Sequence, residues 1–361
     1  MLPLLAALVL AGGGQGPIAR ALYLPNPGFE RSRLLLHIPT DRMEVPKFAP
    51  KHPEWQFDWI TSVLGDVEGE PVQYELRFRV FAQERRKAND KGESVGRLLG
   101  RLWEYNNYRL RFDHAPHFNN RVVDVYICYG GEPGGEQLFD EDSGADGRPV
   151  KVNTIYIYAL DSFTEPVEMA REVCHEYGHA TLPPIGGFSE PEDWANGFLG
   201  EKLYMRTLRD KMAAKLLEPV DAMGATLEAI DAWVKRNVDP LVQSAALKGP
   251  DAELLAGKGP AAMDAYLGLA TYAEAVLPMA VFRRSLVLTG STKASDFPNA
   301  LVMASEEPDT YELTIPEILK GKTLWIPLGK AKVTGAKVLQ RKGDWAKLQP
   351  EAGAKLAVVN R

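Results

Sequence analysis

The chain has 361 residues, a length typical of two or three domains. Its apolar (45%) and charged (25%) fractions are those of a globular protein that can bury a substantial core. A formal net charge of −6 gives no reason to expect nucleic acid or an anionic membrane as a partner.

The N-terminus carries a short apolar run, LPLLAALVLA at residues 2–11, followed by small residues and an Ala-x-Ala sequence at 19–21. Ten apolar residues are too few to span a bilayer, and the pattern is typical of a secretory signal peptide, here residues 1–21. No later segment is apolar enough to span. The sequence therefore predicts an exported protein, secreted or periplasmic, with no membrane insertion after the signal is removed.

Residues 22–90 are predicted to form a β-rich N-terminal region. An apolar run lies at 34–38, and residues 74–81 alternate apolar with charged side chains, the pattern of a half-buried strand. Two tryptophans, Trp55 and Trp59, are expected in the core. The polar stretch that ends this region, ERRKANDKGE at 84–93, is a candidate domain boundary.

The next region is predicted to begin with a helix at 93–105 and a strand at 121–129. The stretch at 130–149 is rich in Gly and Asp and has no periodicity, so it is predicted to be a long surface loop. A calcium site there is the alternative, but its acids do not follow an EF-hand spacing. A further strand is expected at 154–160. The two cysteines, Cys128 and Cys174, are predicted to be buried thiols, although export would also permit a disulfide between them.

The sequence HEYGH at 175–179 is the strongest chemical signal in the chain. On a helix, 3.6 residues per turn bring positions four apart onto one face, so His175 and His179 can reach one ion. Glu176 then lies beside the group that the ion activates, which in such sites is a water molecule. Apolar residues at helical spacing, an N-cap at Thr164 and a proline pair after the motif favour a helix. The alternative is a chance match on an exposed helix.

A catalytic zinc site needs three protein ligands and one open position. Four acids follow the motif within range: Glu190, Glu192, Asp193 and Glu201. Residues 189–192 fit a capping box, which gives the first acids a structural role at a helix start. Glu201 falls on the apolar stripe of that helix, where a lone carboxylate is costly unless it binds metal or pairs with a buried arginine. We predict that Zn²⁺ is held by His175, His179 and Glu201, with Glu190, Glu192 and Asp193 as alternatives.

The HEYGH helix, a loop, and a second helix beginning Trp194-Ala195-Asn196-Gly197 together resemble the gluzincin group of zinc metallopeptidases. Their second helix often contains W-x-N-E-G, in which the glutamate binds zinc, whereas this chain has Gly197 at the glutamate position. A metzincin is excluded, because Leu182 and Ile185 occupy the places of its glycine and third histidine. The resemblance covers about residues 93–210 and implies a zincin-like fold.

That resemblance implies metal-assisted hydrolysis of a peptide or protein substrate. Glu176 is expected to act as the general base and to pass the proton of water to the leaving amine. The strand at 154–160 is expected to be an edge strand that pairs with an extended substrate. Three tyrosines could assist the oxyanion, with nothing in the sequence to choose among them: Tyr204, Tyr266 and Tyr272. The alternative function is a catalytically silent zincin scaffold that binds glycan or protein outside the cell.

Residues 210–285 have helical periodicity and complete the metallopeptidase domain predicted for 91–285. The remaining residues, 286–361, are predicted to form a small β domain, because short strand-like runs such as LVLTG, TYELTI and TLWIPL alternate with turn signals. The fold class predicted is therefore α+β, with a zincin-like domain between a β-rich N-terminal segment and a small C-terminal β domain.

Overall fold

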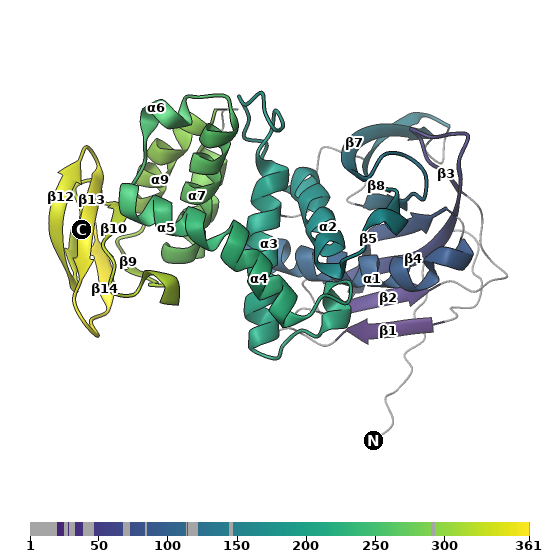
Figure 1. The fold of residues 1–361 in the computed structure, drawn as a ribbon, viewed down its shortest axis with the longest axis horizontal. Coiled ribbons are helices and arrows are strands. Elements are labelled where there is room, and N and C mark those ends of the chain that lie inside the picture. Colours follow the sequence, from purple (N-terminus) through teal and green to yellow (C-terminus); the bar gives the residue numbers. More distant parts are fainter. Residues whose placement is uncertain are drawn as a thin grey trace, which may run out of the picture.

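The protein is described by a computed structural model that covers residues 20–24, 28, 33–38, 47–67, 73–83, 85–112, 114, 122–143, 147–289 and 293–360. It is a mixed α+β structure in which a large sheet lies at one end, helices fill the middle and two small sheets lie at the other end (Figure 1). The expected α+β class is confirmed. The signal peptide predicted for residues 1–21 lies almost wholly outside the described residues.

The large sheet has eight strands and is mixed. In space the order is β1-β2-β4-β5-β6-β8-β7, with β3 paired to β4, and only the β5–β6 and β6–β8 pairs are parallel. The strands are β1 (Arg20–Leu24), β2 (Leu34–Ile38), β3 (Lys47–Phe48), β4 (Gln56–Val67), β5 (Gln73–Ala82), β6 (Val123–Ile127), β7 (Gly134–Ser143) and β8 (Pro149–Tyr158). The sheet therefore includes strands from both sides of the boundary expected near residue 90.

Two expectations about this sheet were wrong. The stretch 130–149, expected to be a loop, contains strand β7, which forms the edge of the sheet. The strand expected at 154–160 is β8, which lies inside the sheet between β6 and β7 and cannot be the edge. The reason is that an edge strand is solvated on one side and can be polar and glycine-rich, so β7 has no apolar alternation to reveal it.

The helices of the central region are α1 (Arg85–Glu104), continued by a π-helical turn at Tyr105–Leu110, then α2 (Pro166–Thr181), α3 (Asn196–Ala213), α4 (Leu227–Asn237), α5 (Asp239–Lys248), α6 (Ala252–Leu255), α7 (Pro260–Val276), α8 (Met279–Thr289) and α9 (Phe297–Glu306). Helix α1 lies between β5 and β6 in the chain, and the other helices follow β8. The predicted helices at 93–105 and in 210–285 are confirmed. Residues 286–289, expected in a strand, belong to α8, because buried residues recur along 281–289 at helical spacing.

Helices α1 and α2 pack on one face of the sheet and enclose the main core. Helix α1 approaches closely because three glycines four residues apart, Gly92, Gly96 and Gly100, face the strands. A Cβ on Gly92 would lie 2.3 Å from the side chain of Ile60, so a larger residue would push the helix off the sheet. The other face carries stacked aromatic rings, including Phe81, Tyr126 and Tyr156, with Trp55 and Trp59 partly buried against them.

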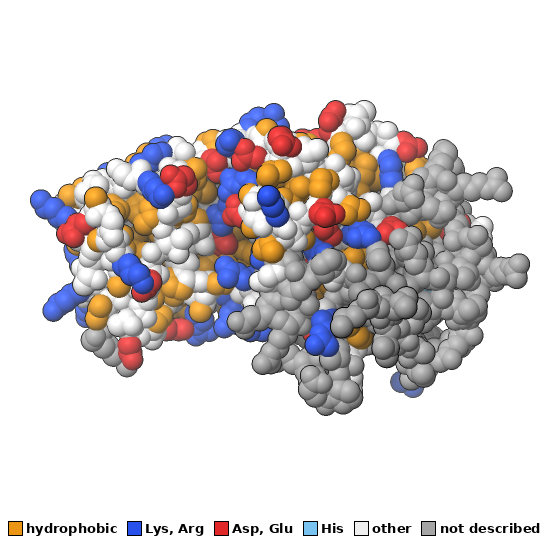
Figure 2. All heavy atoms as spheres, turned by 90° about the horizontal axis from the view of Figure 1, so that it is seen from below, with side chains coloured by type: hydrophobic (Ala, Val, Ile, Leu, Met, Phe, Trp, Pro, Cys, Tyr) orange, Lys and Arg blue, Asp and Glu red, His pale blue; other side chains and the backbone are white. Residues whose placement is uncertain are grey.

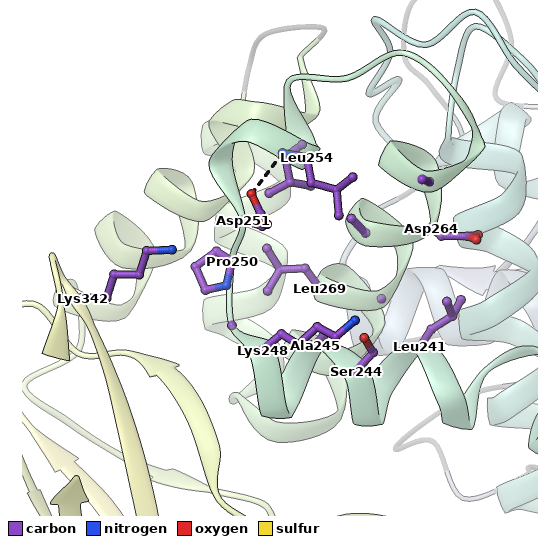
Figure 3. Close-up of a pocket in the computed structure, with 15 residues that line it drawn as sticks. Leu241, Ser244, Ala245, Lys248, Pro250, Asp251, Leu254, Asp264, Leu269 and Lys342 are labelled. Carbon is purple, nitrogen blue, oxygen red and sulfur yellow. Dashed lines mark hydrogen bonds between the residues drawn. The ribbon is translucent and has the colours of Figure 1, made fainter. Parts of the chain in front are cut away.

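The C-terminal module consists of two three-stranded sheets. It begins at Thr310 and not at residue 286 as predicted for the β domain, because Phe297–Glu306 form helix α9. The sheets are β10-β13-β12 and β11-β14-β9. Their strands are β9 (Thr310–Leu313), β10 (Leu324–Pro327), β11 (Lys332–Thr334), β12 (Ala336–Lys342), β13 (Trp345–Pro350) and β14 (Leu356–Val359). The module meets the helices at Trp325, whose backbone carbonyl accepts a hydrogen bond from the Tyr272 hydroxyl (2.8 Å). Beside this contact lies a pocket of about 420 Å³ between α5, α6 and α7, with Lys342 at its rim (Figure 3).

Candidate metal centre

Helix α2 presents the two motif histidines on one face, as their spacing predicts. Their ring centroids are 4.8 Å apart, and the two Nε2 atoms are 3.1 Å apart. The helix begins one residue later than expected, with Glu165 rather than Thr164 at the N-cap and Pro166 at the first helical position. Both imidazoles are largely buried between α2, α3 and the loop that joins them, so their ring nitrogens need partners from the protein or from an ion.

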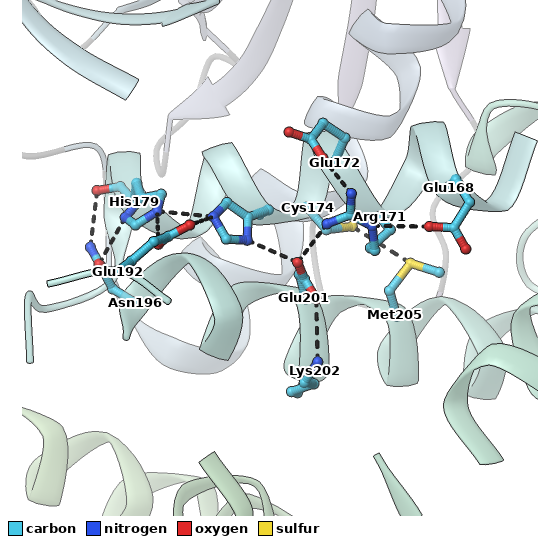
Figure 4. Close-up of polar contacts among 11 residues, drawn as sticks. Glu168, Arg171, Glu172, Cys174, His179, Glu192, Asn196, Glu201, Lys202 and Met205 are labelled. Carbon is cyan, nitrogen blue, oxygen red and sulfur yellow. Dashed lines mark hydrogen bonds and ion pairs between the residues drawn. The ribbon is translucent and has the colours of Figure 1, made fainter. Parts of the chain in front are cut away.

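The third member of the group comes from the loop between α2 and α3. The Glu192 carboxylate places Oε1 3.0 Å from Nε2 of His175 and Oε2 3.1 Å from Nε2 of His179 (Figure 4). These three residues could hold a metal ion, since one ligand atom from each lies within 4.8 Å of the others. Atoms about 3 Å apart can all lie roughly 2 Å from a single ion, which is the distance that zinc takes to nitrogen and oxygen.

Sequence reasoning gave Glu192 a capping role because it placed the helix start too early. Helix α3 begins at Asn196, and residues 186–195 form a loop closed by a bridge between Gly186 and Trp194. The loop is also tied to the α6–α7 connection, because the Ser189 amide donates to the carbonyl of Lys258 (2.9 Å). The capping box was therefore wrong, and the Glu192 side chain turns towards the histidines instead.

Hydrogen bonds on the other ring nitrogens set the tautomers. Nδ1 of His175 lies 2.8 Å from Oε1 of Glu201, and Nδ1 of His179 lies 2.9 Å from Oδ1 of Asn196. The Asn196 amide is oriented by its Nδ2 group, which donates to the backbone carbonyls of His179 and Leu182. Both Nδ1 atoms therefore carry hydrogen, and in the neutral imidazoles the Nε2 lone pairs face each other and a carboxylate. Such a cluster of acceptors requires a cation or protons, so its donor chemistry fits a metal.

In the metal-free protein, protons take the place of the cation. Burial alone would lower the pKa of His175, but hydrogen bonds to Glu192 and Glu201 and the charges of Glu201 and Glu176 outweigh it and raise that pKa to about 10. Burial alone would raise the pKa of Glu192, but both histidines outweigh it and lower that pKa to about 2. Metal binding must displace the protons held here, so affinity for metal should fall in acid.

Glu201, the carboxylate that we predicted as the third ligand, is not in this group. It lies behind His175 and contacts the ring from the Nδ1 side, while Arg171 donates to its Oε1 (2.7 Å) and Lys202 to its Oε2 (3.2 Å) (Figure 4). The alternative weighed for Glu201, an ion pair with an arginine, is what the structure shows. Burial would raise the pKa of Glu201, but His175 and the two cations outweigh it and lower that pKa.

Gly197 explains why the third carboxylate comes from the loop. A Cβ at this position would lie 2.3 Å from Nε2 of His179 and 2.7 Å from Nε2 of His175, against the ligand atoms of both histidines. In the gluzincin pattern a glutamate stands at this place, whereas here the missing side chain leaves room for the carboxylate of Glu192. The glycine in the W-x-N-G sequence was the signal in the sequence that could have pointed to Glu192.

Glu176, the predicted general base, is buried beside the histidines. Its Oε2 atom has no hydrogen-bond partner among the described residues. Burial raises the pKa of its carboxyl to about 8, against the lowering effect of the nearby His175 charge. The side chain lies against edge strand β7 at Gly135, where a Cβ would be 2.5 Å from the Cγ of Glu176. A buried carboxylate with a free oxygen and a raised pKa is the arrangement that general bases use.

The remaining site candidates lie elsewhere or have other partners. Tyr204 donates to Asn106 and Tyr272 to the carbonyl of Trp325, while Tyr266 is wholly buried between aromatic rings. Neither Glu190 nor Asp193 belongs to the described group that could hold a metal.

The two cysteines are buried free thiols, as predicted, and form no disulfide with each other. Burial raises the pKa of both, to about 12 for Cys128, so neither is ionised near neutral pH.

No protein-family model matches the chain, and no curated protein matches it. Among the described helices, none combines the length and the apolar character needed to cross a membrane.

Proposed function

We propose that the chain is a zinc-dependent peptidase with His175, His179 and Glu192 as metal ligands and Glu176 as the general base. The observation that carries the proposal is the convergence of three ligand atoms beside a buried carboxylate that has an unpartnered oxygen. A zinc ion at such a site supplies Lewis acidity, which lowers the pKa of water and polarises a carbonyl. A protein that only binds its target has no need of Glu176 in this place.

The protein's own groups have distinct roles in this proposal. Glu176 removes the proton from the attacking water and delivers it to the leaving nitrogen. A positive charge nearby favours the carboxylate, so the pKa of about 8 in the metal-free protein should fall towards the range where a base works at neutral pH. Glu201 and Asn196 hold the imidazoles with Nε2 directed at the site.

The substrate side of the proposal rests on edge strand β7. Among the described strands it pairs only with β8, so its outer edge can add an extended peptide as a further strand. Gly135 brings that edge against Glu176 without an intervening side chain. The expected substrate strand thus moves from β8 to β7, and the substrate class remains a peptide or protein.

Export forms a separate part of the proposal and depends on the apolar run at residues 2–11. Strand β1 begins at Arg20, so cleavage after Ala21 would remove only its first two residues. Mass spectrometry of the N-terminus of protein collected outside the cytoplasm tests this, and an intact residue 1 there would contradict it.

The test is the metal content and peptide hydrolysis of wild type and of Glu176→Gln. We expect one zinc in each, and a loss of turnover on the order of 10²–10⁴-fold in the variant. The matched control is Glu165→Gln, at the exposed start of the same helix, which should change neither quantity. No zinc in wild type after incubation with it, or unchanged turnover in Glu176→Gln, would overturn the proposal.

A further inference from the structure

The charge of this protein is distributed very unevenly along the chain. Residues 310–361 contain ten Lys and Arg against four Asp and Glu, a net charge of +6. Residues 1–309 contain 32 against 44, a net charge of −12. The overall net charge of −6, which argues against anionic partners, is therefore the sum of an acidic body and a basic C-terminal module. Separation of charge of this kind points to an interaction surface.

The positive charges are concentrated in residues 330–342, which we call the basic segment. It comprises β11, β12 and the residues just before β11, and its five cations are exposed: Lys330, Lys332, Lys337, Arg341 and Lys342. No carboxylate within the described part of the chain forms an ion pair with any of these four lysines. In Figure 2, Lys and Arg side chains project from the end of the molecule that this module forms. Lys330, Lys332, Lys337 and Lys342 are therefore available to an anionic partner.

Two apolar side chains are exposed in the middle of the basic segment. Val338 is 38% exposed and Leu339 is 48% exposed. The pairing of β12 with β13 shifts between Val338 and Gln340, so Leu339 is the extra residue of a β-bulge and has no partner across the strand pair. β12 is also the edge of its sheet. Aliphatic side chains displayed among lysines are the combination that peripheral membrane-binding elements use.

Several features favour a lipid surface over nucleic acid. The basic cluster is lysine-rich, and lysine acts as a point charge, whereas specific phosphate and base contacts favour the planar fork of arginine. The module's tryptophans, Trp325 and Trp345, are buried, so they offer no stacking platform for bases. A bilayer also accounts for the exposed side chain of Leu339, because moving its apolar surface out of water lowers the free energy.

We propose that the basic segment docks the protein onto anionic phospholipid surfaces, with Val338 and Leu339 entering the headgroup region and Lys330, Lys332 and Lys337 contacting lipid phosphates. This docking is independent of the metal site and requires no spanning helix. Binding is electrostatic in its first step, so it weakens with added salt, and its apolar component makes it stronger for vesicles than for soluble polyanions.

The experiment is co-sedimentation of the full-length protein with vesicles of phosphatidylcholine alone or mixed with phosphatidylserine. We expect binding only to the mixed vesicles. Each lysine near such a surface contributes about fivefold in partitioning, so replacing Lys330, Lys332 and Lys337 together by Gln should weaken binding on the order of a hundredfold. Leu339→Ser should weaken it by roughly tenfold while leaving heparin binding unchanged.

A matched control removes three charges from the acidic body: Lys215→Gln, Lys235→Gln and Lys258→Gln combined. All three lysines are exposed, so the fold should survive, which thermal melting checks for every variant. The control should bind mixed vesicles as wild type does. An equal loss in both triple variants would show that only total charge matters and would overturn the assignment. Binding to heparin or duplex DNA without binding to mixed vesicles, or no binding at all, would overturn the lipid partner.

Discussion

Replacing Gly197 by alanine tests the metal centre without removing any ligand or charge. The added Cβ would lie 2.3 Å from Nε2 of His179, whereas ordinary contacts begin at 3.4 Å, so the imidazole must retreat by about 1 Å. Metal–ligand distances tolerate about 0.2 Å. One ligand of a structural zinc site is worth roughly a quarter of 10–16 kcal/mol, about 2.5–4 kcal/mol, so its loss should weaken zinc binding by roughly 70- to 900-fold.

The same substitution should leave the metal-free fold intact. Gly197 has ordinary helical backbone angles at the second position of α3, and alanine favours a helix over glycine by up to about 1 kcal/mol. The displaced imidazole offsets this gain, so we expect the metal-free melting temperature to stay close to that of wild type. Zinc affinity is measured by competition with a chelator, and stability by thermal melting in excess chelator.

Gly200→Ala is the matched control, three residues further along α3. Its Cβ would lie 2.6 Å from the Cα of Gly178 and 2.8 Å from the carbonyl oxygen of Cys174, both in the backbone of α2. This substitution should separate the two helices and destabilise the fold by about 1–3 kcal/mol. If Gly197→Ala binds zinc as tightly as wild type, the two Nε2 atoms are not the ligand atoms and the assigned centre is refuted.

Three further predictions follow from the same contacts. Glu192→Gln should lose zinc, whereas Glu201→Gln should keep it with affinity reduced about 10–100-fold, and metal analysis showing the reverse order would restore Glu201 as the ligand. In metal-free protein the folded state holds the Glu176 proton more tightly (pKa about 8) than the unfolded chain does, so this carboxyl lowers stability as pH rises from about 4.5 to about 8. Glu176→Gln should therefore gain stability over wild type across that window, and melting curves with no such divergence would contradict the buried environment. Thiol reagents should label Cys128 and Cys174 only after unfolding, and rapid labelling of native protein would show that they are accessible.

The parts of this protein that sequence alone predicts are those decided by neighbours along the chain. His175, Glu176 and His179 lie together because helix geometry is local, and the periodicity of residues 166–181 is enough to establish the helix. The alternation at 74–81 correctly predicts β5, and the short turn-bounded runs near the C-terminus correctly predict small sheets. The apolar character of both cysteine neighbourhoods likewise predicts buried thiols.

Other features of this protein depend on contacts between residues far apart in the chain, and only the tertiary structure determines them. Glu192 and Glu201 are both acids near the motif, and only the path of the loop before α3 directs one at Nε2 and the other at Nδ1 of His175. Strand β7 forms because β8 offers it hydrogen bonds, whatever its own weak strand pattern. Position 197 has no room for a side chain because the imidazoles of His175 and His179 from α2 lie against it, and no pattern local to α3 shows that contact.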